Sequence, residues 1–404
     1  GTGLPRSSAM PYGALIGRVA LRQPDEELLG GHSDFYIGET YADLDGTYVF
    51  SWAAPIASTF FRGSQHHELC DQVAVIRVFE HRGDDIVDFY DEPVCDDVPK
   101  QPFRKRTLKI PAPPDRAATL RLPPRGVPAQ PELSSSPSPS PLTAPDATAR
   151  PVRAEALLRA WLAAPRTKSL APVLATLQPD QYDLVTVPAM DSMIIEGHPG
   201  TGKTIIASHW AAYLVNDETP PENSLDGDVL LVGPTTGYSR HVRTVIDRLT
   251  SGSKRVRVLS LPGLMRNLLG LRHKIRGTIS RSWQDVDANL AVFVRAAVTR
   301  LKATRTALTV DTVYNYLQNN GSDEHPLTQD PEWITYLRRL PPVQDALFTR
   351  AHAPLLATIK WEVAKPRDFT GIEHIIVDEA QDVTPLEWLL LASMNEAHAW
   401  TIIR

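Results

Sequence analysis

A glycine-rich stretch holds the residues of this chain best suited to chemistry on phosphates. "GHPGTGKT", from Gly197 to Thr204, fits the pattern G-x-x-x-x-G-K-[ST]. Gly200 and Gly202 would let the backbone turn tightly, so that amide N–H groups point at phosphate oxygens, and the start of the next helix would add partial positive charge. The Lys203 ammonium would reach the β- and γ-phosphates, and the Thr204 hydroxyl would bind Mg²⁺. The stretch therefore predicts a site for ATP and Mg²⁺.

The flanking sequence is what a phosphate-binding loop requires. An apolar run, "SMIIEG", precedes the loop and a helical pattern, "TIIASHWAAYLV", follows it, which disfavours the alternative of an ordinary glycine-rich turn. We interpret His198 as a spacer and not as a catalytic group. The predicted nucleotide contacts from the loop are Gly197, His198, Pro199, Gly200, Thr201, Gly202, Lys203, Thr204 and Ile205.

A second stretch, "HIIVDEAQD", could supply the carboxylates that a phosphate loop needs. Asp378 and Thr204 are the predicted magnesium residues, and Glu379 would align and deprotonate the attacking water. Gln381 would bond to the γ-phosphate or to that water, so Lys203, Glu379 and Gln381 are the predicted catalytic residues. The alternative, an acidic helix start that complements the helix dipole, is the weaker interpretation beside the glycine-rich loop.

The elements around these residues predict a parallel α/β fold. "SMIIEG", "DVLLVGP" at 228–234 and the run that begins at His374 have the apolar pattern of buried parallel strands. Between the second and third lies a long segment of helical patterns, from about 262 to 364. Strands that alternate with helices predict a parallel sheet with helices on both faces, and the helical segment predicts an insertion in it.

The N-terminal part has a different composition. Residues 12–92 predict short strands, with hairpins at Asp45-Gly46 and around Gly83-Asp84. Residues 93–151 are rich in proline and poor in aromatic residues, which predicts an extended, disordered linker. "RAEALLRAWLAAP" then predicts a helix by its periodicity.

The composition is that of a globular protein with two or three domains. Of 404 residues, 42% are hydrophobic and 22% are charged. No apolar run approaches the roughly 18–20 residues that span a bilayer, and the N-terminus lacks the apolar core of a signal peptide. Cys70 and Cys95 predict neither a disulfide framework nor a zinc cluster. We therefore expect a cytoplasmic protein without a membrane partner.

The charge distribution leaves the question of nucleic acid open. The net charge of −5 gives the whole chain no electrostatic reason to bind a polyanion. Between Ser239 and Arg281, however, many Lys and Arg residues accompany a single acid, Asp247. This stretch could face DNA, RNA or an acidic protein surface, and solvated helix faces are an equally good interpretation.

The two motifs together resemble a known superfamily. "GHPGTGKT" with "VDEAQD" resembles motifs I and II of superfamily 1 nucleic-acid motors of the UvrD/Rep type. "LQPDQYDLV" resembles the Q motif of that superfamily, which implies that Gln181 contacts the adenine edge, and "LVGPTTGYSRHV" stands in the place of motif Ia. The resemblance implies a RecA-like P-loop fold.

A narrower resemblance is to HelD, a bacterial ATPase family that binds RNA polymerase and strips it from nucleic acid. "FYIGETYADLDGTYVFSWAAPIASTFFRG" resembles the YIGR…DEDG…VDWRAP…FYR block of that family, and the sequence from "WLAAPRTKSL" to "GHPGTGKT" resembles the start of its first motor domain. The similarity covers about residues 12–92, 153–262 and 370–404. It implies RNA polymerase as the partner.

The chain also departs from this family. The long N-terminal coiled coil has no counterpart before residue 12, and "SWAAP" lacks the arginine of the family pattern. The sequence ends at "AWTIIR", in a predicted strand and before motif III and the second motor domain, which supply the arginine fingers and part of the adenine pocket. We therefore expect a fragment or truncated product that binds ATP weakly and hydrolyses it slowly.

The predicted organisation has four parts. These are a β-rich module at 1–92, a linker at 93–152, a RecA-like motor domain at 153–262 and 365–404, and a helical insertion at 263–364. The leading functional hypothesis is the ATP-hydrolysing motor domain of a HelD-like ATPase. The alternatives are a fragment of a UvrD-type DNA helicase and a regulatory protein that binds nucleotide without efficient turnover.

Overall fold

The chain divides into two structural units. The computed structural model describes residues 15–44, 46–63, 67–82, 85–96, 102–103, 177–198, 200–250, 252–277, 287–319 and 326–404. The first unit comprises Gly1–Trp52 and Glu68–Gln178, and the second comprises Ala53–His67 and Pro179–Arg404. The segment 53–67 is thus grouped with the second unit, although the sequence places it between strands of the first.

The first unit is built on a mixed six-stranded sheet. Its strands are β1 (Leu15–Asp25), β2 (His32–Gly38), β3 (Ala42–Asp43), β4 (Tyr48–Ser51), β5 (Val73–Arg82) and β6 (Asp85–Pro93), in the order β3-β4-β2-β1-β5-β6. Strands β2 and β4 are parallel, and the other neighbours are antiparallel. The hairpins predicted on either side of residues 45–46 and 83–84 are confirmed by the antiparallel pairs β3/β4 and β5/β6.

Several sequence predictions fall on residues that the structure does not describe. Asp45, Gly83 and Asp84 of the predicted turns lie outside the described residues, as do all but a few residues of the predicted linker. The helix predicted for "RAEALLRAWLAAP", residues 153–165, also lies outside them.

The second unit contains a parallel five-stranded sheet. Its strands are β7 (Met193–Ile195), β8 (Asp228–Gly233), β9 (Val256–Ser260), β10 (Ile372–Val377) and β11 (Asn395–Ile403), in the order β7-β11-β10-β8-β9. Every neighbouring pair is parallel, which confirms the three strands that the apolar runs predict. Strand β9 is not among the predicted strands. Arg255 and Arg257 place it in the basic segment between Ser239 and Arg281, where no apolar run indicates a strand.

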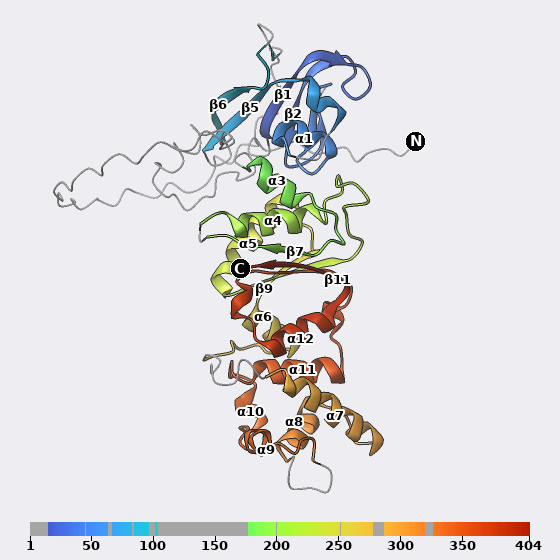
Figure 1. The fold of residues 1–404 in the computed structure, drawn as a ribbon, viewed down its shortest axis with the longest axis vertical. Helices are drawn as coiled ribbons and strands as arrows, with labels where there is room; N and C mark the ends of the chain where they lie inside the picture. Colours follow the sequence, from blue (N-terminus) through green and yellow to red (C-terminus); the bar gives the residue numbers. More distant parts are fainter. Residues whose placement is uncertain are drawn as a thin grey trace, which may run out of the picture. The chain divides into compact units, whose positions relative to one another are not determined.

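Helices cover both faces of this sheet (Figure 1). Helices α4 (Lys203–Tyr213) and α5 (Thr236–Leu249) cover one face, with α3 (Pro179–Val185) beside α4. Helices α6 (Leu261–Leu268), α11 (Ala353–Val363) and α12 (Pro385–Met394) share a buried apolar core with the other face. Local sequence sets these starts: Thr235, Ser260 and Thr384 each accept a backbone N–H with the side-chain oxygen.

Between α6 and α11 the regular elements of the described residues are helices, joined by turns and irregular segments, and one isolated bridge links Arg276 and Thr349. Helices α7 (Asn289–Ala303), α8 (Val310–Gln318), α9 (Pro331–Arg338) and α10 (Val343–Ala346) form a second apolar core with α11. Arg350, just before α11, donates to the carboxylate of Glu387 in α12, and both residues are buried. No helix in the described part of the chain has the length and apolar character to cross a membrane.

Candidate functional site

The predicted site residues meet at one edge of the parallel sheet. Because β7, β8 and β10 run in the same direction, the loops that follow them emerge at the same edge. The glycine-rich loop follows β7, the start of α5 follows β8, and Asp378 follows β10. Strand β11 lies between β7 and β10 and separates the loop strand from the carboxylate strand.

The glycine-rich loop has the backbone that its sequence predicts. Gly200 and Gly202 have φ angles of +87° and +89°, which side-chain-bearing residues rarely adopt. Gly202 directly precedes α4, and its carbonyl accepts the amide hydrogens of Ile205 and Ile206 at 2.9 and 3.0 Å. A Cβ on Gly197 would lie 2.9 Å from the Thr201 hydroxyl oxygen.

Two backbone carbonyls of the loop bond to the Lys203 ammonium, and Pro199 lies outside the described residues. The ammonium donates to the carbonyl oxygen of Gly197 and, at 3.3 Å, to that of His198. The Thr201 hydroxyl donates to the same His198 carbonyl at 2.9 Å. The loop thus folds around the lysine, with His198 contributing its backbone to these bonds.

The closest link between the loop and the carboxylates is a bond between Thr204 and Asp378. The Thr204 hydroxyl donates to Oδ2 of Asp378 at 2.9 Å, across 174 positions of the sequence. Asp378 is 4% exposed, and its backbone N–H donates to the Val232 carbonyl at 2.9 Å, which extends the ladder between β10 and β8. The sheet therefore holds this carboxylate in place beside the start of α4.

Tyr238 bonds to the same oxygen of Asp378 as Thr204 does, and it is not among the site residues predicted from the sequence. Its hydroxyl donates to Oδ2 of Asp378 at 2.7 Å. The ring lies against Gly233, where an added Cβ would be 2.1 Å from ring carbons, so only glycine fits there. Burial, then the negative charge of Asp378, raises the pKa of Tyr238, so the phenol keeps its proton. The available signal was a tyrosine in the first turn of a helix that follows a buried strand.

Glu379 and Gln381 form the exposed part of the site. Glu379 has a φ of +55°, an unusual backbone for a residue with a side chain, and it precedes the short helix η7 (Ala380–Asp382). Its N–H donates to Oδ1 of Asp378 at 2.9 Å. The Gln381 amide donates to Oε2 of Glu379 at 2.5 Å. Strain of this kind, on the order of 1–3 kcal/mol, gathers at functional sites.

Gln181 reaches the same loop from α3. Its amide nitrogen lies 3.4 Å from the Thr201 carbonyl oxygen. A Cβ on Gly202 would lie 3.3 Å from that nitrogen, so a larger residue at 202 would crowd Gln181. The structure therefore brings the described loop residues and Gln181 together, and joins the loop to the Asp378–Gln381 stretch through the Thr204–Asp378 bond.

The donor set suits a magnesium ion that takes most of its ligands from phosphate and water. In the part of the chain that the structure describes, no three His, Cys, Asp or Glu side chains gather to hold a metal by themselves. A hydroxyl and a carboxylate lie together at Thr204 and Asp378, and oxygen ligands are those that Mg²⁺ prefers. These residues fit Mg²⁺ bound together with a nucleotide.

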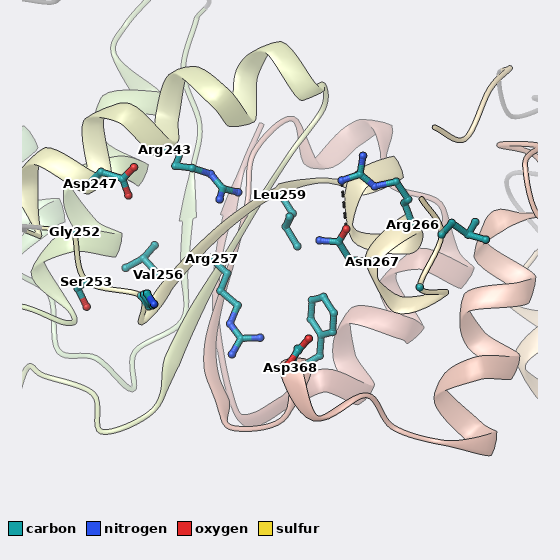
Figure 2. Close-up of a pocket in the computed structure, with 14 residues that line it drawn as sticks. Arg243, Asp247, Gly252, Ser253, Val256, Arg257, Leu259, Arg266, Asn267 and Asp368 are labelled. Carbon is teal, nitrogen blue, oxygen red and sulfur yellow. Dashed lines mark hydrogen bonds between the residues drawn. The ribbon is translucent and has the colours of Figure 1, made fainter. Parts of the chain in front are cut away.

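A cavity lies elsewhere in the second unit, beside the edge strand β9 (Figure 2). It measures about 850 Å³, and its lining includes none of the predicted site residues. Three arginines in it bond within the chain: Arg243 to the Val258 carbonyl, Arg257 to Asp228 at 2.8 Å, and Arg266 to the Asn267 amide oxygen at 3.4 Å. These three arginines of the basic segment thus have partners within the chain.

One comparison with known families gives a match. Residues 4–105 match the family described as "DNA helicase IV HelD, N-terminal domain". The match covers about a quarter of the chain and includes the segment 53–67 of the second unit, whereas the glycine-rich loop and the carboxylates lie outside it. No curated protein matches the chain. The match relates the chain to HelD-type helicase-related proteins.

Proposed function

We propose that the second unit binds ATP with Mg²⁺ at the carboxyl edge of its parallel sheet and hydrolyses it. In this proposal the parallel sheet of that unit belongs to the RecA-like first motor domain, predicted at residues 153–262 and 365–404, of a HelD-like ATPase of superfamily 1. The observation that carries the proposal is the 2.9 Å bond between Thr204 and Asp378, which joins the two motifs at one point. The N-terminal family match supports the HelD-like part.

The chain's own groups account for binding of the triphosphate. The loop backbone at Gly200–Thr204 offers N–H groups and the start of α4 to phosphate oxygens. The Lys203 ammonium, now bonded to two loop carbonyls, turns to the β- and γ-phosphates when they bind. Thr204 and Asp378 would hold the magnesium ion, which would neutralise charge on the phosphates. Gln181 contacts the base.

Glu379 is the group that handles the proton during hydrolysis. Its exposed carboxylate accepts the proton of a water molecule as the water oxygen attacks the γ-phosphorus and the bond to the β-phosphate oxygen breaks. The Gln381 amide, which donates to Oε2 of Glu379, fixes the direction of that carboxylate. The products are ADP and phosphate. The partner in this proposal is RNA polymerase, which ATP turnover would release from nucleic acid.

Calorimetric titration with Mg-ATP tests the binding. We expect the chain to bind Mg-ATP, and Lys203→Ala to weaken binding at least about tenfold, because the ammonium that reaches the β- and γ-phosphates is lost. Lys254→Ala is a matched control, since Lys254 lines the cavity beside β9 and not the loop. Absence of binding by the wild type, or equal loss in both variants, would overturn the proposal.

A second experiment separates the HelD-like function from a DNA helicase. Purified chain is mixed with RNA polymerase and, separately, with single-stranded DNA at several salt concentrations. We expect co-migration with the polymerase and no specific retention of DNA. Salt-dependent DNA binding without polymerase binding would favour the helicase alternative.

A further inference from the structure

A short segment inside the N-terminal family match packs against the helix that carries Gln181. It includes η2 (Pro55–Ala57) and α1 (Ser58–Phe61), and it belongs to the second unit. The side chains of Phe60 and Phe61 are fully buried. Arg62 ends α1 in a left-handed conformation, with φ at +58°, and its N–H donates to the Ser58 carbonyl at 2.7 Å. The chain is thereby turned toward α3.

Phe61 and Gly63 both pack closely against α3. The Phe61 ring stacks on the Tyr182 ring, with centroids 4.4 Å apart and planes inclined by 12°. Tyr182 is 1% exposed. A Cβ on Gly63 would lie 2.4 Å from Oδ1 of Asp183 and 2.8 Å from a ring carbon of Tyr182. The backbone at Gly63 therefore lies directly on α3, and no larger residue fits there without movement.

The same short helix contacts the phosphate loop. Gln181 precedes Tyr182, so its side chain points about 100° further round the helix. That side chain lies 3.4 Å from the Thr201 carbonyl and next to Gly202. Because α3 is only seven residues long, a shift at Tyr182 also moves Gln181. The Phe61 ring contacts the helix that carries Gln181, whereas the Lys203 ammonium bonds to two loop carbonyls and the Thr204 hydroxyl bonds to Asp378.

We propose that residues 58–63 position α3, and through it Gln181, for recognition of the nucleotide base. The inference rests on the proposed nucleotide site. A glutamine amide recognises adenine through its amino group and a ring nitrogen, which requires a defined side-chain position. The triphosphate is held by the loop and Lys203, independently of Phe61. Phe61 therefore acts as a positioning residue for base selectivity and not for phosphate binding.

The test measures affinity for three probes with Mg²⁺: ATP, ITP, which carries an oxygen in place of the adenine amino group, and inorganic tripolyphosphate. We expect the wild-type chain to prefer ATP over ITP. Phe61→Leu should reduce that preference about two- to tenfold, the range that one stacked aromatic pair supports. The tripolyphosphate affinity should stay within about twofold of wild type. Tyr182→Phe, which keeps the stacked ring, should retain the ATP preference.

Further variants keep the test decisive. Gln181→Ala should lose the same preference, and adding Phe61→Leu to it should cause no further loss. Phe293→Leu, a buried phenylalanine in α7, controls for general destabilisation. If circular dichroism shows that Phe61→Leu does not fold, Gly63→Ala takes its place, with the same expected loss.

The outcomes separate this inference from the proposed function. An unchanged ATP preference in Phe61→Leu, equal loss of ATP and tripolyphosphate affinity, or a wild type that does not distinguish ATP from ITP would each overturn the inference while the nucleotide site stands. A wild type that binds none of the three probes would overturn both.

Discussion

Asp378 is the residue on which the site converges, since one of its oxygens accepts hydrogen bonds from both Thr204 and Tyr238. Two donors on one oxygen fix the orientation of the carboxylate before any ligand binds. When a residue that donates a hydrogen bond to a metal ligand is removed, the affinity for the metal commonly falls. We therefore propose Tyr238 as a positioning residue for the magnesium ion of the proposed site.

Tyr238→Phe tests that role. We expect the Mg²⁺ concentration for half-maximal ATP binding to rise about tenfold, because Asp378 loses the donor that orients it. Metal-free binding of tripolyphosphate should stay unchanged. Tyr314→Phe is the matched control, since the Tyr314 hydroxyl also bonds a neighbour, the Pro341 carbonyl, but lies in the helical part. The same Mg²⁺ requirement in Tyr238→Phe and wild type would contradict this account.

Glu379 is the second residue with a testable role. Glu379→Gln keeps the size of the side chain and removes its ability to accept a proton, so ATP hydrolysis should fall by about 10²–10⁴-fold. The ATP affinity should change by less than about threefold. Single-turnover measurements of phosphate release, with enzyme in excess, resolve even a slow wild-type rate. Full hydrolysis by the variant would show that another group takes the proton.

At the residue scale, sequence spacing predicts motifs that are contiguous in the chain. It does not predict contacts between residues that are distant in the sequence. The glycine-rich loop and the Asp378–Gln381 stretch are each contiguous, so their chemistry can be interpreted from the pattern, and their roles stay predictions until they are tested. Tyr238 was missed because its function depends on a hydrogen bond across 140 positions. No rule of spacing connects a tyrosine after one strand with an aspartate after another.

Among the elements, helix α12 follows the carboxylate strand and is held by a buried ion pair. Glu387 is fully buried, caps the start of α12 by accepting the Thr384 N–H at 3.0 Å, and pairs with Arg350. Burial raises the pKa of Glu387, and the positive charge of Arg350 opposes that shift. The ion pair thus connects Arg350, at the end of the helical stretch between α6 and α11, to α12, which follows Asp378 in the sequence.

Arg350→Met should destabilise the second unit by about 3–5 kcal/mol, because it leaves the Glu387 carboxylate buried without its partner. Urea unfolding followed by circular dichroism measures the effect. Adding Glu387→Gln, which keeps an oxygen for the cap and removes the charge, should recover at least half of the loss. Additive losses in the double variant would show that the two residues act independently.

Helix α4 carries a buried histidine that makes stability depend on pH. Burial lowers the pKa of His209 from 6.5 to about 4, although its ring bonds the Ile205 carbonyl. Between pH 4 and 6.5, His209 is mostly protonated in the unfolded chain and mostly neutral in the folded chain. Stability is therefore full above pH 6.5 and declines as the pH falls toward 4, by at most about 1.4 kcal/mol per pH unit from this group.

His209→Leu should make that decline shallower. Urea midpoints at pH 7 and pH 5 provide the measurement, and His374, whose pKa is also lowered to about 4 by burial, accounts for part of the decline that remains. An identical difference between the two midpoints in wild type and variant would show that His209 does not titrate on unfolding in this range.

The elements differ in how well their sequence reveals them. Strands β8 and β10 are buried along apolar runs, and β7 is a short strand in a third such run, although only its Ile195 is buried, so composition alone predicts all three. Strand β9 alternates, with Val256 and Val258 buried and Arg257 half-buried against Asp228. Its one arginine, Arg257, lies in this edge strand, and it interrupts the apolar run by which the other strands can be predicted.

At the scale of the whole molecule, the two units do not follow the order of the chain. The segment 53–67 leaves the first unit, packs in the second, and the chain then returns to the first unit at Glu68. The sequence could not predict this exchange, because "IASTFFRG" is as apolar as the strands beside it. The contact between Phe61 and Tyr182 exists only in the folded chain. The N-terminal family match and the nucleotide-binding pattern therefore share one structural unit through this segment.

The most direct test of the central claim is a crystal structure of the chain with a non-hydrolysable ATP analogue and Mn²⁺, with the metal located by its anomalous scattering. The account predicts one metal peak beside the Thr204 hydroxyl and the Asp378 carboxylate, with the triphosphate over Gly200–Thr204 and the base at Gln181. A nucleotide bound in the cavity beside β9, or a metal remote from Thr204 and Asp378, would contradict it.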